Sequence, residues 1–495
     1  MAADDQHIIA IDIGTSTIKI AVFDRKAKIK SIVKMRIPLL HPRPGWIEQD
    51  PEEIWKLTLL GIKNAINVAK IDPKSVTVLG LANQRGSIVV WDSRTGKAVH
   101  NVIVWQCRRT ENIVQAIKRE YEAFVKKKTG LIPSSNFSGV KIKWLIENRP
   151  KIKEKLLSGE FLVGTLDTFI LWKLSNGKLY MTDYTNASRT LLFNIHNLTW
   201  DKELLDLLEI PEIPLPEPKP SCEIYGHVNL EVIKINIPVG SVIGDQQASL
   251  FGHTAFRLGS TKCTYGTGNF VLMNTGEKPV FAKNLLTTIA WGLSRSRVSY
   301  AIEGSLFTTG SAIDWLINNL GLLSSVHEIE EIMVRTPSSN GVYFVPALLG
   351  LGAPYWNPNV RGLLVGLKRS TTRFHIIRAV LESIAYATRD IIEEMEKVMK
   401  IKVKELRVDG GLSNINSLMQ FQADILGVNV VRPKISETTL LGTAYLAGLA
   451  IDIWQSLSDI EKLWEVDKVF KPHMDEDVRE KLYLGWKEAV RKSLC

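Results

Sequence analysis

Near its start the chain alternates apolar and polar positions in two runs, residues 8–13 and 18–23, which the polar link Gly14-Thr15-Ser16-Thr17 joins. This alternation predicts two β-strands, and the shortness of the link predicts a hairpin between them. A helix is predicted downstream, because Asp50-Pro51-Glu52-Glu53 supplies a cap, a first-turn proline and first-turn acids.

Predicted strands and helices go on alternating to about residue 250, beginning with strands at residues 76–82 and 88–91. This order is typical of an α/β domain rather than of an all-helical one. The second half begins again with strands, and two long helices follow. Those elements are predicted at residues 262–274, 286–291 and 298–303 for the strands and at 373–399 and 414–426 for the helices.

Two domains are predicted, 1–253 and 254–495, because a chain of 495 residues is too long for one ordinary core. Each half starts with a strand, a Gly-Thr turn and a second strand, although chance alone often produces such an echo. A cleft between the two domains is where we expect a functional site.

The composition is that of a globular protein, with 45% hydrophobic and 23% charged residues and no run of about eighteen uncharged apolar residues that could cross a bilayer. The start MAADDQHIIAIDIG carries acids where a secretory signal would carry basic residues. We therefore expect a cytoplasmic protein with no membrane partner. The four cysteines are scattered without the spacing of a zinc site or a disulfide framework.

A net charge of +10 raises the question of nucleic acid as a partner. The Lys and Arg residues are, however, spread through Glu-containing helical segments such as 112–128 and 475–492. A solvated basic surface that also suits small anionic ligands explains this better than a nucleic-acid site, so no nucleic-acid partner is expected.

Two common nucleotide-binding motifs are absent, since the chain has neither a P-loop nor a GxGxxG segment after a strand. The link 14–17 offers a different phosphate site, because a Gly-led turn can aim backbone N–H groups and hydroxyls at phosphate while Lys19 adds positive charge. An ordinary polar hairpin turn is the alternative. Asp12 favours the phosphate site, because an acid that ends an apolar strand is costly unless it serves a metal or a hydrogen-bond network.

A second turn of the same character is Tyr265-Gly266-Thr267-Gly268, and two such turns could hold one polyphosphate between them. Asp245, which follows an apolar strand and precedes two glutamines, has the setting of a carboxylate base, and a helix cap is the equal alternative. Asp409-Gly410-Gly411 suits a close approach of the backbone to a ligand, and equally a plain strand-to-helix turn.

Long segments of the chain resemble the FGGY carbohydrate kinases, which are relatives of hexokinase, actin and the heat-shock ATPases. The similar segments include PGWIEQDPEEIW, NVIVWQCRRT, MTDYTNASRTLLFNIHNLTWD, GDQQASLFG, TYGTGNFVLMNTGE, GLGAPYWNP, HIIRAVLESIAYATRD and LRVDGGLSN. The resemblance covers nearly the whole chain and is greatest to the branch that phosphorylates glycerol. It implies an α/β fold of two actin-like, ribonuclease H-like domains around a central cleft, and an ATP-dependent, Mg²⁺-assisted kinase of a small polyol that forms a homodimer.

The resemblance also implies roles for individual residues. Asp245 would be the catalytic base, and Asp12 and Asp245 would lie near Mg²⁺. The residues implied in ATP binding are Thr15, Ser16, Thr17, Lys19, Gly266, Thr267, Gly310, Asp314, Gly411 and Asn414. Those implied in the acceptor pocket are Arg85, Gly86, Trp105, Asn136, Gln246 and Phe270.

Two positions depart from the glycerol-phosphorylating branch, which has Glu where this chain has Gly86 and Tyr where it has Asn136. Losing a charged partner for a buried hydroxyl costs about 1.5 to 3 kcal/mol. We therefore expect a wider pocket and a larger polyol, such as a sugar alcohol or cyclitol. The alternatives are a kinase that keeps glycerol as its acceptor, neighbours that refill the space, an actin-like or chaperone-like ATP switch, and an inactive kinase.

Overall fold

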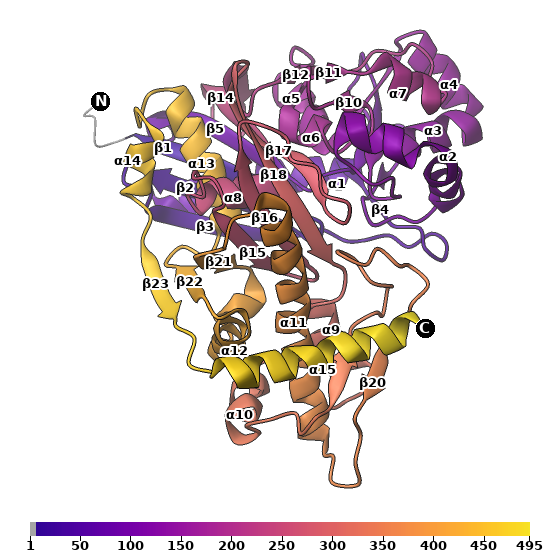
Figure 1. The fold of residues 1–495 in the computed structure, drawn as a ribbon. Helices are drawn as coiled ribbons and strands as arrows, with labels where there is room; N and C mark the ends of the chain where they lie inside the picture. Colours follow the sequence, from indigo (N-terminus) through magenta and orange to yellow (C-terminus); the bar gives the residue numbers. More distant parts are fainter. Residues whose placement is uncertain (1–5) are drawn as a thin grey trace.

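A computed structural model describes residues 6–495, and in that part each half of the chain builds one large β-sheet (Figure 1). Residues 1–5, which the predicted first domain and the acidic start include, lie outside it. The first sheet has the order β13 (Cys222–Leu230), β14 (Ile235–Gly244), β5 (Val76–Asn83), β1 (His7–Ile13), β2 (Thr17–Asp24) and β3 (Ile29–Arg36). The predicted hairpin at the start is β1 and β2, paired antiparallel.

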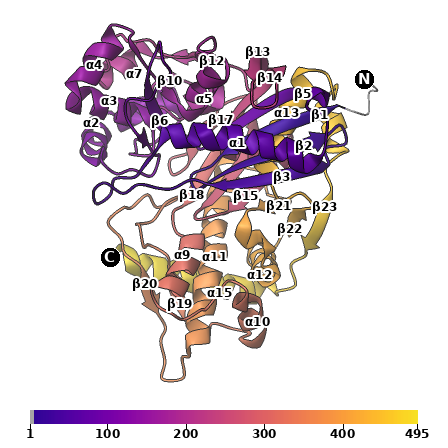
Figure 2. The ribbon, with the colours of Figure 1, turned by 180° about the vertical axis from the view of Figure 1, so that it is seen from behind.

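The central strand β1 is buried along its whole length, and its two faces meet different helices. Ile9, Ile11 and Ile13 share one apolar cluster with α1 (Pro51–Ala69), while Ile8 and Ala10 share another with α13 (Thr438–Ala450). Side chains alternate between the faces of a strand, so a strand covered on both faces becomes a continuous apolar run. Figures 1 and 2 show α1 and α13 beside this sheet.

The second sheet repeats the arrangement of the first. Its order is β17 (Leu286–Ser294), β18 (Arg297–Leu306), β16 (Asn269–Gly276), β15 (Thr261–Tyr265), β21 (Glu405–Asp409), β22 (Asn429–Pro433) and β23 (Val466–Phe470). In each sheet the first strand, β1 or β15, pairs antiparallel with the next strand and parallel with a later one, β5 or β21. The similarity between the two halves is therefore a similarity of strand order and strand pairing.

A long segment between β5 and β14 adds several helices and three strands of a small sheet, whose fourth strand, residues 48–49, precedes β5. The sheet has the order β4 (Glu48–Gln49), β7 (Val102–Ile103), β6 (Ile88–Asp92) and β8 (Phe161–Thr165). The helices are α2 (Glu111–Thr129), α3 (Ser138–Asn148), α4 (Pro150–Leu157), α5 (Leu166–Leu174), α6 (Tyr184–Ala187) and α7 (Lys202–Leu207). Short strands complete it, β9 (Met181–Asp183), β10 (Phe193–Asn194), β11 (Thr199–Trp200) and β12 (Glu217–Lys219), and η2 (Pro73–Ser75) precedes β5.

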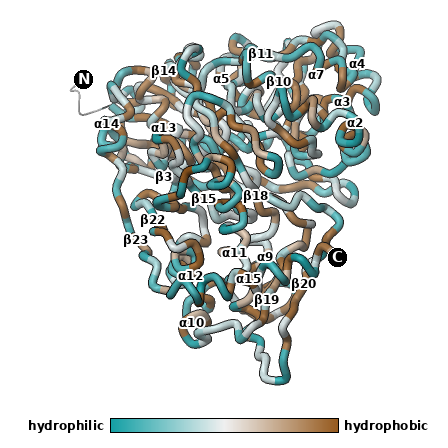
Figure 3. The backbone as a smooth tube through the Cα atoms, viewed as in Figure 1, coloured by the Kyte–Doolittle hydropathy of each residue, from teal (hydrophilic) through white to brown (hydrophobic). Residues whose placement is uncertain are grey.

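The remaining helices join the two sheets or cover the second one. They are α8 (Asp245–Gly252), α9 (Gly310–Asn318), α10 (Glu328–Arg335), α11 (Arg373–Met399), η3 (Gly411–Asn414), α12 (Asn416–Leu426), α14 (Leu457–Glu461) and α15 (Glu476–Leu494), with the strand pair β19 (Tyr343–Val345) and β20 (Leu363–Val365). Figure 3 shows apolar segments running through both halves and hydrophilic ones on outer helices such as α2.

The two halves are interleaved by α13. This helix belongs to the second half of the chain, yet it packs on the first sheet and against α8. Its backbone approaches that of α8 at Gly252 and Gly442, where an added Cβ would lie about 2 Å from a carbonyl oxygen of the other helix. The division at residue 253 stays a prediction. No helix within residues 6–495 combines the length and apolar character that a membrane-spanning helix needs.

Candidate active site

Neighbouring parallel strands of the first sheet end at one edge and deliver the polar residues of the candidate site there. Asp12 on β1 lies opposite Ala82 on β5, and Gly244 at the end of β14 lies opposite Asn83. Arg85 and Asp245 follow directly on β5 and β14. Ligands of open α/β sheets bind outside the carboxyl ends of such strands, so this edge is the natural place for a reaction.

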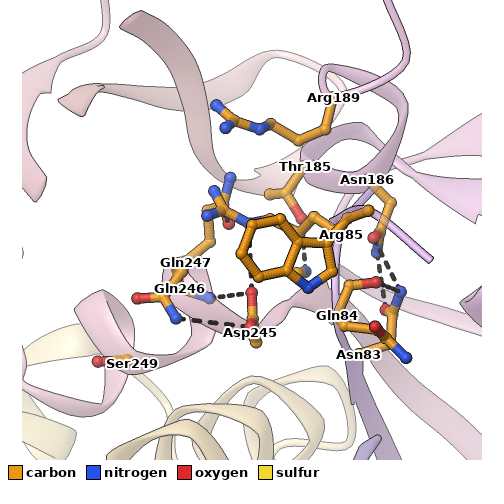
Figure 4. A network of polar contacts seen from close by, with 12 residues as sticks. Asn83, Gln84, Arg85, Thr185, Asn186, Arg189, Asp245, Gln246, Gln247 and Ser249 are labelled. Carbon is orange, nitrogen blue, oxygen red and sulfur yellow. Dashed lines mark hydrogen bonds and ion pairs between the residues drawn. The ribbon is translucent and has the colours of Figure 1, made fainter. Parts of the chain in front are cut away.

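Asp245 opens α8 and keeps one carboxylate oxygen free of short contacts (Figure 4). Its Oδ1 accepts a hydrogen bond from the Gln246 backbone N–H at 2.8 Å and lies 3.2 Å from Nε of Arg85. Its Oδ2 receives only a long contact from Gln246 Nε2, at 3.4 Å. A quarter of the side chain is exposed (25%). The carboxylate is thus oriented through one oxygen and open to a ligand through the other, which suits the predicted base.

Arg85 is held far more tightly than the sequence indicates. Its Nη1 donates to Glu303 Oε2 at 2.7 Å and to Gln247 at 3.2 Å, and its Nη2 donates to Glu303 Oε1 at 3.2 Å. Together with the contact to Asp245, these bonds leave a single Nη2 hydrogen free at most. Arg85 can therefore donate at most one hydrogen bond to an acceptor hydroxyl. Its contacts in the structure orient Asp245.

Glu303, on β18 of the second sheet, joins two arginines of the first half and is completely buried. Besides Arg85, it accepts a bond from Arg189 Nη2 at 3.1 Å. Burial alone would raise the pKa of this carboxyl, but the two guanidinium groups lower the pKa to about 2. Sequence reasoning missed Glu303, although the signal used for Asp12, an acid in an apolar strand, was present in segment 298–303.

Aromatic side chains predicted for the acceptor pocket meet beside the first phosphate turn. The rings of Trp105 and Phe270 pack edge to face with centroids 6.2 Å apart, and the Arg85 guanidinium lies 5.9 Å from the Phe270 ring. Nε1 of Trp105 donates to Thr15 Oγ1 at 2.9 Å. The structure therefore brings together residues predicted for the acceptor and for ATP.

Gly86 does not border an empty space. It has a left-handed backbone conformation (φ 76°), and an added Cβ would lie 2.3 Å from the backbone oxygen of Asn136. The buried Lys141 holds the loop around Asn136, because its Nζ donates to the carbonyls of Ser135 at 2.8 Å and Phe137 at 3.0 Å. Backbone of Asn136 thus lies at the Cβ position of any side chain at residue 86. The expectation of a wider pocket stays a prediction.

The turn 14–17, the first of the two predicted phosphate-binding turns, is closed by a hydrogen bond from the Gly14 N–H to the Thr17 oxygen at 3.0 Å. Ser16 is exposed, and Thr15 and Thr17 are half-buried. Lys19 is less free than predicted, because its Nζ lies 2.6 Å from Glu437, which also pairs with Lys34 at 2.6 Å. Glu437 precedes α13, so the second half of the chain reaches this turn.

The second turn gathers most of the other predicted ATP residues. The Gly310 N–H donates to the Gly266 oxygen at 3.0 Å, and the Thr309 and Ser311 N–H groups donate to the Thr267 oxygen at 3.1 and 3.2 Å. Gly411 has open space where a Cβ would stand. Asp314 and Asn414 are exposed on α9 and η3, and η3 packs beside β15. The Cβ position of Gly310 lies 2.6 Å from the Gly266 oxygen, so this glycine lets two backbone segments pack closely, whereas Gly411 leaves room for a ligand.

Asp409, at the end of β21, joins the second sheet to α8 and α13. This buried carboxylate accepts hydrogen bonds from Ser249 at 2.7 Å, from His253 at 3.1 Å and from Thr438. Its charge also helps to raise the pKa of Lys19, which lies beside the first turn. The carboxyl ends of the two sheets are therefore within electrostatic reach of each other.

Asp12 offers an oxygen suited to a divalent cation. The side chain is buried, and within residues 6–495 its Oδ1 has no hydrogen-bond partner. Burial raises the pKa of this carboxyl to about 7; Lys19 opposes the shift, and Asp245 and Glu437 add to it. Within residues 6–495 no three His, Cys, Asp or Glu side chains form a metal site. Mg²⁺ is commonly held by one or two carboxylates plus phosphate oxygens and water, so Asp12 and Asp245 fit such an ion.

Comparisons with known proteins agree over the whole chain. The description "FGGY family of carbohydrate kinases" fits residues 7–252 as its N-terminal domain and 261–451 as its C-terminal domain. "Glycerol kinase" of Thermococcus onnurineus is 52% identical over 490 residues, which is 99% of this chain and 98% of that protein. "Glycerol kinase 2" of Saccharolobus solfataricus is 50% identical over 98% of this chain and 97% of its own.

A solved structure, glycerol kinase of Plasmodium falciparum with ADP, matches with a TM-score of 0.92 at 37% identity, covering 99% of this chain and 98% of the other. The two expected actin-like domains are thereby confirmed as the fold. With both family domains present in order and whole-chain relatives at about half identity, this chain belongs to the FGGY family of carbohydrate kinases and is an ATP-dependent phosphotransferase.

Proposed function

We propose that this kinase transfers the γ-phosphate of ATP to a hydroxyl of glycerol. The observation that carries the proposal is the Asp245 carboxylate, held through Oδ1 and open at Oδ2, beside the Gln246 amide and the rings of Trp105 and Phe270. Aromatic faces suit the C–H groups of a short polyol, and a carboxylate with an amide suits two adjacent hydroxyls. Relatives named glycerol kinase at about 50% identity support the acceptor.

In this mechanism the attacking hydroxyl donates its hydrogen to Oδ2 of Asp245. As the new O–P bond forms and the bond from the γ-phosphorus to the bridging oxygen of ADP breaks, the hydroxyl proton passes to that carboxylate. Arg85 keeps Oδ1 turned away from the acceptor, and Gln246 Nε2 holds a neighbouring hydroxyl. Asp12 and Asp245 would hold Mg²⁺, which would supply positive charge to balance the phosphate oxygens.

A panel of acceptors tests the proposal. Glycerol, tetritols, pentitols and inositols are each offered with ATP and Mg²⁺, and ADP release is measured. We expect the highest kcat/KM for glycerol. A longer polyol preferred by about tenfold or more, a difference of ~1.4 kcal/mol, would reject glycerol as the acceptor. Rapid ATP hydrolysis that no polyol stimulates would instead favour the ATP-switch alternative.

A larger polyol is the second candidate acceptor, favoured by the half-buried Asn136 where the glycerol branch has Tyr. A short amide occupies less volume than a phenol ring and can bond to an additional hydroxyl. The variant Asn136→Tyr separates the two candidates in the same panel. It should reduce the use of long polyols if they are the substrates, and should leave glycerol turnover within about threefold if glycerol is, since Tyr is the residue that the glycerol branch has at this position.

Mg²⁺ binding should weaken as the pH falls below about 7, because a proton competes for Asp12, whose carboxyl pKa is raised to about 7. Above that pKa the carboxylate is ionised and can bind the metal. Below it the affinity for Mg²⁺ falls roughly tenfold per pH unit. Calorimetric titration of Mg²⁺ into the ADP complex at pH 8, 7 and 6 measures this slope.

The variant Asp12→Asn is the control for that slope, because it removes the titrating group while keeping the shape of the side chain. It should bind Mg²⁺ weakly at every pH, with only the pH dependence that ADP itself contributes. An unchanged slope in the variant would contradict a role of Asp12 at the metal. A cytoplasmic location and a homodimer remain predictions, and sedimentation of the purified chain tests the second.

A further inference from the structure

Lys262 is a buried lysine on β15 of the second sheet that touches the acceptor residue Gln246. Its side chain is completely buried, and Nζ donates to Gln246 Oε1 at 2.7 Å and to Thr264 Oγ1 at 2.7 Å. We infer that Lys262 is a positioning residue that fixes the orientation of the Gln246 amide, and so decides which kind of hydrogen bond the acceptor receives. This inference rests on the proposed polyol kinase function.

The orientation follows from the chemistry of the two groups. An ammonium group only donates hydrogen bonds, so Gln246 must turn its amide oxygen toward Lys262. The amide nitrogen then faces Asp245 Oδ2, at 3.4 Å. The opposite orientation would set the amide N–H groups against the ammonium and the amide oxygen against the carboxylate, and both contacts would be repulsive. The sequence pair Asp245-Gln246 alone leaves this choice open.

This orientation has a consequence for the acceptor. Gln246 presents only N–H donors toward Asp245, so a polyol hydroxyl bound there must accept a hydrogen bond. That hydroxyl can still donate its own hydrogen in a bond to a carboxylate or to water. An acceptor with a protonated amine at this position offers no lone pair and is excluded. Lys262 thereby acts on specificity through Gln246 without touching the acceptor.

The cost of burying Lys262 is offset by acids of both sheets. Burial lowers the pKa of the ammonium group, and the charges of Asp409 and Asp245 oppose that shift while Arg85 adds to it. A buried charge is retained where hydrogen bonds and opposite charges compensate its lost hydration. Lys262 lies on the strand that leads into the turn 266–268. The second half of the chain therefore fixes the orientation of the amide of Gln246, a residue predicted to bind the acceptor.

The test is a double-mutant cycle in the full-length chain with glycerol as the probe. Lys262→Met removes the donor at similar volume and should raise the KM for glycerol about ten- to a hundredfold, with the KM for ATP within about twofold. Gln246→Ala should raise the glycerol KM by a similar factor. In the double variant the two effects should not multiply, because Lys262 acts only through Gln246.

Two further variants separate positioning from a general loss of structure. Thr264→Val removes the other acceptor of Lys262 and should change the glycerol KM by less than about threefold. Lys262→Gln restores an N–H donor and should recover most of the loss in glycerol KM. If Lys262→Met does not fold, the cycle is run with Lys262→Leu in its place, which also lacks a donor, and the same rule of non-multiplying effects applies.

Specific outcomes overturn the inference. Effects of Lys262 and Gln246 variants that multiply, or a rise in the ATP KM equal to that in the glycerol KM, would show that Lys262 acts on the fold in general. Failure of the proposed function is distinguishable, because the unaltered chain would then phosphorylate no polyol of the panel or would prefer a longer polyol to glycerol. Glycerol turnover by the unaltered chain together with multiplying effects would reject the inference alone.

Discussion

Asp245→Asn is expected to lower kcat by about 10²- to 10⁴-fold, the usual contribution of a positioned general base. Asparagine keeps the size of the side chain and can still accept the bond from the Gln246 N–H at the position of Oδ1. It cannot take the proton that the acceptor hydroxyl releases. ADP release with glycerol and ATP measures the loss, and thermal unfolding shows that the fold is intact.

The nearby Gln247→Ala variant is the control for changes at the start of α8. Gln247 contacts Arg85 but not Asp245, so its removal should lower kcat by far less than the loss of the carboxylate. A kcat for Asp245→Asn within about tenfold of the unaltered chain would mean that another group accepts the proton.

Glu303→Ala is expected to lower the free energy of unfolding by about 3 to 5 kcal/mol, because it leaves two buried guanidinium groups without their shared carboxylate. Arg85 and Arg189 are both buried, with distances to Glu303 of 2.7 and 3.1 Å. Since Arg85 also orients Asp245, kcat should fall together with stability. Denaturant unfolding and ADP release measure the two effects.

A matched control is Glu465→Ala, which removes a carboxylate 2.7 Å from Lys434 in a pair whose two side chains are 57% and 67% exposed. Exposed ion pairs contribute about 0 to 1 kcal/mol, so the deficit should be small. Equal deficits in the two variants would contradict the importance of burial at Glu303.

The deficit caused by Glu303→Ala should also be the same at pH 6 and pH 8. The folded carboxyl pKa is lowered from 4.5 to about 2, so its stabilising contribution is complete above the unfolded pKa and is lost only as the pH falls through 2. A deficit that shrinks between pH 8 and pH 6 would assign the effect to a different titrating group.

Local patterns predicted the parts of this molecule that depend on neighbouring residues. Alternation gave the hairpin of β1 and β2, and capping residues gave α1. The long helix predicted at residues 373–399 is α11 with the same bounds. Asp12 and Asp245 stood out because each ends an apolar strand. These signals are local because strand alternation, caps and turns act within a few residues.

What the sequence could not predict depends on contacts between distant residues. Glu303 lies 218 positions from its partner Arg85, and no local pattern pairs them. The surroundings of Gly86 are a second case, because the backbone oxygen of Asn136 lies 2.3 Å from where a Cβ would stand. Backbone position is a property of the whole packing arrangement, so no local pattern around Gly86 could predict this close approach.

Buried contacts between the halves also decide where this enzyme can flex. Glu303 on β18, Lys262 on β15 and Asp409 on β21 fasten the second sheet to Arg85, Gln246 and Ser249. Bending the molecule at residue 253 would break all of these bonds and leave several charged groups buried without partners. These contacts therefore tie the groups around Asp245 to strands of both sheets.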